Sequence, residues 1–218
     1  LTSAGYALVV VPGAVSLSNS TVAVGSGTVA SGSSTSVTVT VRDSFGNQIP
    51  SGNTVVLNNT GGTSTGSFST VTDNGNGTFS ANFTGLVAGS PTTITATVNG
   101  SAITSVLPTI SVTPGVISPA FSIVTVSSGS VVSGNGVTLT LTGRDSNNNP
   151  TVSGGATVTF SYSGGTSTGL IGSTTDVGNG TYTATFTGQA SGTATTITAL
   201  INGVSVSTTL PTVVVNTG

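Results

Sequence analysis

Apolar and polar residues alternate along several short segments of this chain. In the segment SVTVTV, Val37, Val39 and Val41 fall on one face, while Thr38 and Thr40 fall on the other. This period of two is typical of a β-strand with one buried face. Further segments predict these inward residues: Val137, Leu139, Leu141, Phe79, Ala81, Phe83, Tyr182, Ala184, Phe186, Ile94, Ala96, Val98, Ile197, Ala199, Ile201, Ala156, Val158, Phe160 and Tyr162. No segment shows a helical period.

Turn residues separate the alternating segments about every 8 to 12 residues, a spacing typical of a sandwich or barrel. In the first half of the chain we expect about seven strands. They lie near residues 21–30, 35–43, 53–60, 66–72, 77–84, 91–99 and 102–113. The pattern predicts an all-β fold of immunoglobulin-like Greek-key β-sandwiches.

The chain repeats itself at an offset of about 102 residues. VPGAVSLSNSTVAV at 11–24 matches TPGVISPAFSIVTV at 113–126, and GGTSTG occurs at 61–66 and again at 164–169. We therefore expect two tandem domains, 14–114 and 115–218, joined at Pro114-Gly115. In this register residues 1–13 correspond to the terminal strand of a preceding repeat. Alternatively, residues 1–11 form an N-terminal arm that adds as a strand to a neighbouring subunit.

Composition narrows the chemistry of the protein. The 218 residues include no His, Cys, Lys, Glu, Trp or Met, and Ser and Thr together occupy 78 positions. The usual catalytic acids, bases, nucleophiles and zinc ligands come largely from the missing types, so we expect no enzyme. With two basic residues, the chain lacks the charge that dominates binding to nucleic acid and to anionic membranes. We therefore expect neither partner.

The segment YALVVV at 6–11 is too short to span a bilayer, which predicts no membrane insertion in this part of the protein. An excess of Ser, Thr, Gly and Asn with few charges is typical of secreted surface and filament proteins. The composition therefore favours an extracellular, cell-surface location.

All six charged residues occupy matching positions in the two copies. Arg42 matches Arg144, Asp43 matches Asp145, and Asp73 matches Asp176. Strand order places these aspartates at one end of each sandwich, the end that receives the incoming chain. A calcium ion at these four aspartates is one hypothesis, since Ca²⁺ takes carboxylate and carbonyl oxygens.

The alternative is structural, with each Asp accepting backbone N–H bonds in an Asx turn. This alternative is favoured, because two carboxylates per site are few and an Arg stands beside one of them. For the two arginines we expect hydrogen bonds to a nearby Asp or to loop carbonyls. We expect no cofactor other than this candidate calcium.

Three motifs occur together and in order: VRDSFGNQIPSGNTVVL, VTDNGNGTFSANFTG and TTITATVNG. They resemble bacterial immunoglobulin-like repeats of the invasin and intimin type, and the hairpin motif is similar to that of filamin repeats. The resemblance covers nearly all of both copies. In the second copy, RDSNNNP shortens the loop and places Asn where the family has Gly, which leaves the conformation of that loop open.

The resemblance implies a stalk module of an adhesin or surface fibre, whose partners are further repeats of the same kind. In that family receptor binding lies in specialised terminal domains, and no host ligand follows from these residues. Our first hypothesis is a non-catalytic spacer. The second is a self-assembling filament, sheath or surface-layer subunit that uses residues 1–11 as a donated strand.

The third hypothesis is a calcium- or glycan-binding module. A glycan platform needs exposed aromatic rings, and Tyr162 and Tyr182 have inward parity, which weakens that idea. GGTSTG lacks the Lys and following helix of a phosphate loop and is expected to be a flexible turn. Glycosylation sequons occur at Asn19, Asn58, Asn76, Asn82, Asn99 and Asn179, and Asn82 has outward parity.

Overall fold

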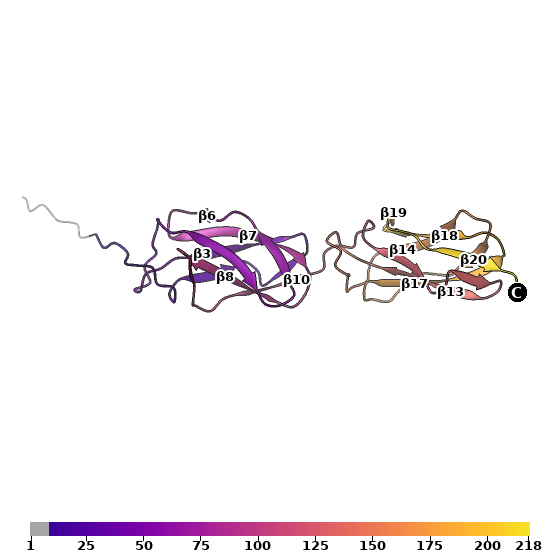
Figure 1. Cartoon of the computed structure of the whole chain (residues 1–218), viewed down its shortest axis with the longest axis horizontal. Helices are drawn as coiled ribbons and strands as arrows, with labels where there is room; N and C mark the ends of the chain where they lie inside the picture. The colour runs from indigo at the N-terminus through magenta and orange to yellow at the C-terminus, as the bar shows by residue number, and fades with distance from the viewer. Residues whose placement is uncertain (1–8) are drawn as a thin grey trace, which may run out of the picture. The chain divides into compact units, whose positions relative to one another are not determined.

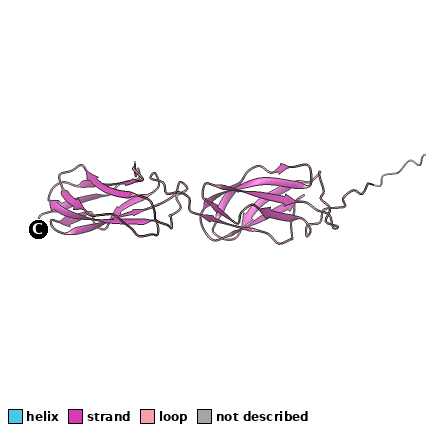
Figure 2. Ribbon diagram, turned by 180° about the vertical axis from the view of Figure 1, so that it is seen from behind, coloured by secondary structure: helices cyan, strands magenta, loops and turns pink. Residues whose placement is uncertain are grey.

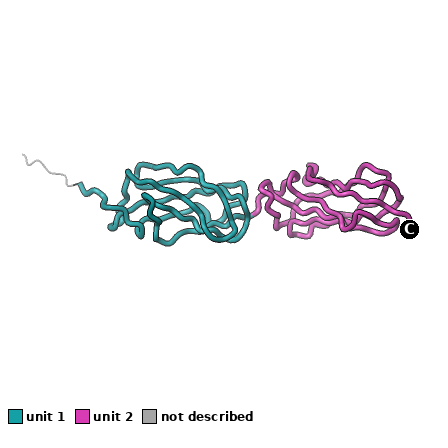
Figure 3. The backbone as a smooth tube through the Cα atoms, viewed as in Figure 1, with its two compact units in different colours: residues 1–113 teal, residues 114–218 magenta. Residues whose placement is uncertain are grey.

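The computed structural model describes residues 9–218 and contains strands and loops but no helix in that range (Figure 2). The chain divides between Thr113 and Pro114 into two compact units, coloured separately in Figure 3. The expected terminal strand or arm at 1–13 falls largely on residues 1–8, which lie outside the described residues. Residues 9–13 carry no strand.

The described residues of unit 1 form ten strands in two sheets. Several of these strands are labelled in Figure 1. The ten strands are β1 (Thr21–Val24), β2 (Thr28–Ala30), β3 (Ser34–Thr40), β4 (Val55–Thr60), β5 (Thr65–Phe68), β6 (Thr72–Asp73), β7 (Thr78–Val87), β8 (Thr92–Val98), β9 (Ser101–Ala102) and β10 (Thr109–Thr113). One sheet has the order β1-β3-β7-β5, with β6 on β7, and the other has the order β2-β10-β8-β4, with β9 on β8. Only β2 and β10 are paired in parallel among these strands. This is the predicted Greek-key sandwich.

Unit 2 repeats the arrangement strand for strand. Its elements are β11 (Ile123–Val126), β12 (Ser130–Val132), β13 (Gly136–Thr142), β14 (Val158–Ser163), β15 (Thr168–Ile171), β16 (Thr175–Asp176), β17 (Thr181–Ala190), β18 (Thr195–Ile201), β19 (Val204–Ser205) and β20 (Thr212–Asn216). The sheet orders are β11-β13-β17-β15 and β12-β20-β18-β14. The internal duplication read from the sequence is thus a duplication of fold.

The inward faces predicted by alternation form the two cores. In unit 1, Val37, Val39, Phe83 and Ile94 are fully buried between the sheets, and Leu139, Leu141, Phe186 and Ile197 take the same places in unit 2. The aromatic ring of Phe68 meets that of Phe83 edge-on, with ring centroids 5.2 Å apart. Thr occupies most outward positions of these strands, where its β-branched side chain suits both the strand and water.

Three predicted strands are each divided in the structure. The expected strand 21–30 is two strands, β1 and β2, which belong to different sheets. The hydroxyl of Ser26 accepts the N–H of Thr28 at 3.2 Å and donates to its carbonyl at 2.7 Å, which turns the chain between the sheets. Val22 and Val24 occupy even positions and Val29 an odd one, so the alternation changes phase across residues 25–28, a change that the prediction of a single strand overlooked.

The other two divisions concern the expected strands 66–72 and 102–113. The expected strand 66–72 is divided into β5 and β6, which both pair with β7. The expected strand 102–113 is divided into β9 and β10. Pro108 lies between these two strands and has no N–H to donate, although its carbonyl accepts the N–H of Ile94 at 2.9 Å. No helix in residues 9–218 is long and apolar enough to cross a membrane.

Candidate functional site

The loop after β3 is built around one buried carboxylate. Asp43 is only 1% exposed, and its two oxygens accept four hydrogen bonds. Oδ1 accepts the backbone N–H groups of Phe45 and Asn47, both at 2.9 Å. Oδ2 accepts the side-chain amide of Asn47 at 3.0 Å and the N–H of Gly13 at 2.9 Å. Asp43 therefore closes its own loop and also holds the segment that enters unit 1.

The loop after β13 repeats this arrangement around Asp145. Its Oδ2 accepts the N–H of Gly115 at 2.8 Å and the amide of Asn149 at 2.9 Å. Its Oδ1 accepts the backbone N–H groups of Asn147 and Asn149, both at 2.9 Å. We name these two groups of residues the Asp43 clamp (Asp43, Asn47 and Gly13) and the Asp145 clamp (Asp145, Asn149 and Gly115).

The substitution of Asn for Gly in the second copy does not change the loop. Gly46 has a φ of +84°, and Asn148 at the matching position has a φ of +67°. Asn tolerates this left-handed conformation better than other non-glycine residues. The connection between β13 and β14 is one residue longer than that between β3 and β4, so the loop is not shortened as expected. Only the spacing from Asp145 to Pro150 is shorter than that from Asp43 to Pro50.

Hydrogen bonding keeps both clamp carboxyls ionised. The side-chain amide of Asn47 and the N–H of Gly13 lower the pKa of Asp43 most, against the opposing effect of burial, and the result is about 2. For Asp145 burial is the largest single effect and raises the pKa. The donors Gly115, Asn149 and Asn147 together outweigh it, so the pKa of Asp145 lies below its usual value.

Each Arg beside a clamp binds loop carbonyls. Arg42 donates from Nη1 to the carbonyl of Gly46 at 2.7 Å, and Arg144 donates to the carbonyl of Asn148 at 2.9 Å. Of the two contacts expected for these residues, the one with loop carbonyls is confirmed. The guanidinium groups thereby support the outer rim of each clamp loop.

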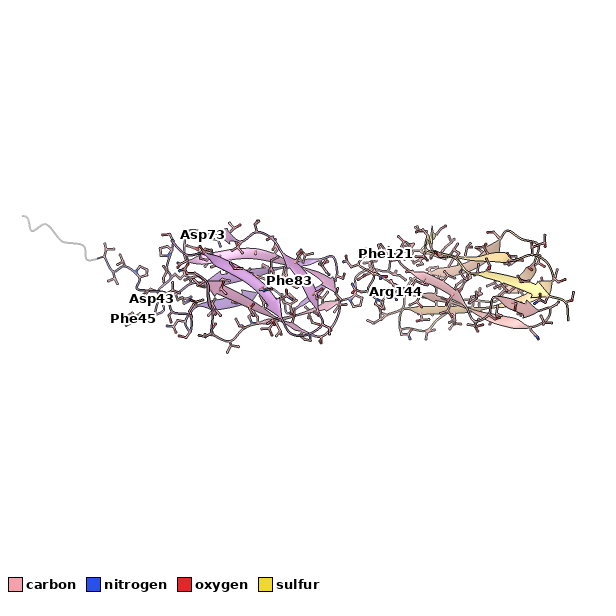
Figure 4. The ribbon with its side chains drawn as sticks, viewed as in Figure 1. Asp43, Phe45, Asp73, Phe83, Phe121 and Arg144 are labelled. Atoms are coloured by element: carbon pink, nitrogen blue, oxygen red, sulfur yellow. The ribbon has the colours of Figure 1, made fainter. Side chains whose placement is uncertain are left out.

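The second pair of aspartates differs between the units. Figure 4 shows Asp73 at the same end of unit 1 as Asp43. Asp73 is exposed and its Oδ1 accepts the N–H of Gly75 at 2.9 Å, as in an Asx turn. Asp176 makes the same bond to Gly178 at 2.8 Å, but its Oδ2 also accepts the N–H of Gly155 at 2.7 Å. In unit 2 this carboxylate therefore fastens the longer loop between β13 and β14.

The calcium hypothesis at Asp43, Asp73, Asp145 and Asp176 stays a prediction. The described residues contain no cluster of three or more His, Cys, Asp or Glu side chains. Both oxygens of Asp43 and of Asp145 already face N–H donors, and a cation bound there would meet the positive ends of those dipoles. The donor set therefore fits the structural interpretation better than it fits a metal.

The GGTSTG motif forms the corner between β4 and β5, as expected for a turn between strands, and its serine is buried and hydrogen-bonded. In unit 1 its Ser64 is 1% exposed, donates to the carbonyl of Gly89 at 2.9 Å and accepts the buried N–H of Val112 at 2.9 Å. Ser167 accepts the N–H of Val215 at 2.9 Å in unit 2. The one available signal was the recurrence of the motif in both copies, because a Ser flanked by two threonines carries no hydrophobic pattern.

Two exposed phenylalanines were not predicted as candidate binding residues, since only tyrosines were weighed for a glycan platform. Phe45 lies in the Asp43 loop and is 88% exposed, and Phe121 lies before β11 and is 41% exposed. Tyr182 is buried as expected, and its hydroxyl accepts the N–H of Ala156 at 3.0 Å. Asn82 is exposed, as its parity predicted, and its modification stays a prediction.

Comparisons with known proteins extend the resemblance seen in the sequence. The family model described as "Invasin, domain 3" matches twice, at residues 16–115 and 118–218. A solved structure of the Escherichia coli adhesin FdeC is similar with a TM-score of 0.52 and 21% identity, over 96% of this chain and 67% of that chain.

A solved structure of invasin, described as a bacterial integrin-binding protein, is similar with a TM-score of 0.56 and 23% identity. The match covers 94% of this chain but only 41% of that chain, so the protein described here spans less than half of that relative. No match to a curated protein was found. At these identities the solved structures show only the shared fold. The family model covers nearly the whole of both units, so the chain belongs to the invasin domain 3 family of immunoglobulin-like adhesin domains.

Proposed function

We propose that the chain is a non-catalytic spacer within an extracellular bacterial adhesin, with further immunoglobulin-like repeats as its neighbours. Membership of the invasin domain 3 family supports an adhesin. Of the two proteins that share its fold, FdeC is described as an adhesin and invasin as an integrin-binding protein. The same comparison supports a location at the cell surface. A spacer of this kind acts mechanically, by holding another part of the protein at a distance from the cell.

The Asp145 clamp is the observation that carries this proposal. At the end of β10, the carbonyl of Thr113 accepts the N–H of Ser31 at 2.8 Å within unit 1. Two residues later, Gly115 is bound by Asp145 within unit 2. Only Pro114 lies between these anchored positions, and its ring fixes φ. A linker with so few free torsions suits a spacer that limits bending between its units.

Distance measurements between the units test the proposal. Because the chain has no Cys, a Thr70→Cys and Ser173→Cys variant can be spin-labelled at these two exposed sites alone. We expect a narrow distance distribution by pulsed electron paramagnetic resonance. As a control, a Gly-Ser insertion after Pro114 is expected to broaden it. A broad distribution in the protein without the insertion contradicts the spacer proposal.

Self-assembly is a second candidate function, favoured by one observation. Val9, Val10 and Val11 are 75 to 80% exposed and form an apolar β-branched run before the first strand. Such a run suits addition to a free sheet edge. Deletion of residues 1–11 is expected to abolish assembly measured by light scattering if this function holds, and unchanged scattering contradicts it.

A further inference from the structure

Unit 2 contains a surface pocket that the spacer function does not use. Its volume is about 410 Å³, within the range of small-ligand sites. The pocket lies between the turn before β11, the Asp145 loop and the segment that connects β19 to β20. It is lined by Ala120, Phe121, Ile123, Asn148, Thr208 and Thr209.

The matching positions in unit 1 carry a different set of side chains. There Ser18, Asn19 and Thr21 replace Ala120, Phe121 and Ile123, and Gly46 replaces Asn148. The first three positions are therefore polar in unit 1 and apolar in unit 2. The pocket chemistry belongs to unit 2 and is not a property of the shared fold.

Where unit 1 has Asn19, unit 2 has Phe121, and two side-chain hydrogen bonds are thereby lost. In unit 1 the amide of Asn19 donates to the carbonyls of Asp43 at 3.2 Å and Ser44 at 3.0 Å, which ties the clamp loop to the turn before β1. Phe121 has no side-chain donor for this purpose, and its ring is 41% exposed. An exposed aromatic ring at a position that makes two hydrogen bonds in the other copy departs from the usual burial of aromatic side chains. Departures of this kind are found most often at functional sites.

The lining groups define the ligand that fits. An exposed aromatic face attracts the slightly positive C–H groups of a sugar ring, and Ile123 extends this apolar surface. Asn148 supplies an amide at the rim. The hydroxyl of Thr208 donates to the carbonyl of Ser122 at 2.8 Å and thus presents its lone pairs as acceptors. No charged side chain is among the lining residues, which favours a neutral ligand over an acidic one.

We propose that this pocket of unit 2 binds a neutral saccharide, stacked on Phe121 and hydrogen-bonded by Asn148 and the two threonines. The site goes beyond the spacer role, because it gives this repeat a weak contact with glycans that unit 1 lacks. Figure 4 shows Phe121 at the same end of unit 2 as Arg144, whose Nη1 binds the carbonyl of Asn148 and so supports the rim.

Titration of the full chain with neutral methyl hexosides and methyl N-acetylhexosaminides tests the proposal. In carbon-detected spectra, we expect at least one of these sugars to shift the signals of Phe121 and Ile123 in a saturable way. Phe121→Asn, which installs the residue of unit 1, is expected to weaken binding by about tenfold or more. Phe121→Tyr is expected to keep it, since the aromatic face remains.

Two further variants keep the outcome unambiguous. Phe45→Ala removes the exposed ring of unit 1 and is expected to leave binding unchanged. Asn148→Gly, which also installs the residue of unit 1, is expected to weaken binding even if Phe121→Asn fails to fold. The proposal is overturned if no sugar shifts Phe121, if Phe45 and Phe121 shift alike, or if the folded Phe121→Asn or Asn148→Gly variant binds as tightly as the native protein.

Discussion

The carboxylate of Asp145 accepts the N–H of Gly115 at 2.8 Å, and Asp43 accepts that of Gly13 at 2.9 Å in the same way. In each unit, one buried side chain on the loop after the third strand therefore holds the segment that precedes the first strand. The bond joins residues 30 positions apart in both copies. A contact of this range fixes where the chain enters the sandwich.

Removal of the Asp145 carboxylate should destabilise unit 2. Asp145→Ala leaves the N–H groups of Gly115, Asn147 and Asn149 without their acceptor, and we expect a loss of about 3 kcal/mol in the free energy of unfolding. Urea denaturation followed separately in each unit by NMR measures this loss. Unit 1 serves as the internal control, and a change in unit 2 below about 0.5 kcal/mol contradicts the role given to the clamp.

Acid should destabilise both units in a defined pH range. The folded pKa of Asp43 is about 2, below the value of about 3.9 in an unfolded chain, and the pKa of Asp145 is lowered as well. The two ionised carboxylates therefore contribute fully to the free energy of unfolding above pH of about 4, and this contribution is lost as the pH falls toward about 2. Since the chain has no His, we expect no histidine-linked change near neutral pH.

Thermal unfolding at a series of pH values checks this expectation. An Asp43→Asn, Asp145→Asn double variant is expected to start with a lower melting temperature and to lose less of it in acid. If the double variant and the native protein show the same decrease between pH of about 4 and about 2, the two clamps are not its source.

The buried faces could be read from the sequence because a strand places alternate residues on opposite sides. Val37, Phe83 and their counterparts Leu139 and Phe186 are buried as the period of two predicts. The end of the sandwich that holds Asp43 also followed, because the order of strands determines which loops lie together. The Asx-turn bond from the N–H of Phe45 to Asp43 was expected and is confirmed, but the bond from Gly13 was not expected, since Gly13 is brought to Asp43 only by the folded chain.

Other features depend on contacts that a periodic pattern does not describe. The division of residues 21–30 between two sheets depends on how Ser26 bonds to Thr28, and the pattern shows it only as a change of phase between Val24 and Val29. The role of Ser64 depends on the approach of Val112, which lies 48 residues away. The pocket beside Phe121 arises from three segments distant in the sequence. Such contacts depend on tertiary structure, which local patterns do not contain.

The buried serine of the GGTSTG corner gives a third prediction. Ser167→Ala leaves the buried N–H of Val215 without an acceptor, and we expect unit 2 to lose about 1 to 3 kcal/mol of stability. Equilibrium unfolding in urea measures the loss. Ser173→Ala, at an exposed loop position, is the matched control and is expected to have little effect. Equal stabilities of the two variants would show that the corner is held by other contacts.

The left-handed residue of the clamp loop gives the last prediction. Gly46 has a φ of +84°, and a Cβ added there would meet no atom within 4 Å, so any effect of substitution is conformational and not steric crowding by neighbours. Gly46→Asn installs the residue that unit 2 carries at φ +67°, and we expect a stability within about 0.5 kcal/mol of the native value. Gly46→Val forces a β-branched side chain into the same conformation.

For Gly46→Val we expect a loss of about 1 to 2 kcal/mol, because the left-handed region brings Cβ too close to the following carbonyl oxygen. Urea denaturation of the two variants side by side measures the difference, and unit 2 again provides the internal reference. A Val variant as stable as the Asn variant would mean that the loop rearranges. In that event the bond from Arg42 to the carbonyl of residue 46 should be lost as well, which the guanidinium signals of Arg42 would report.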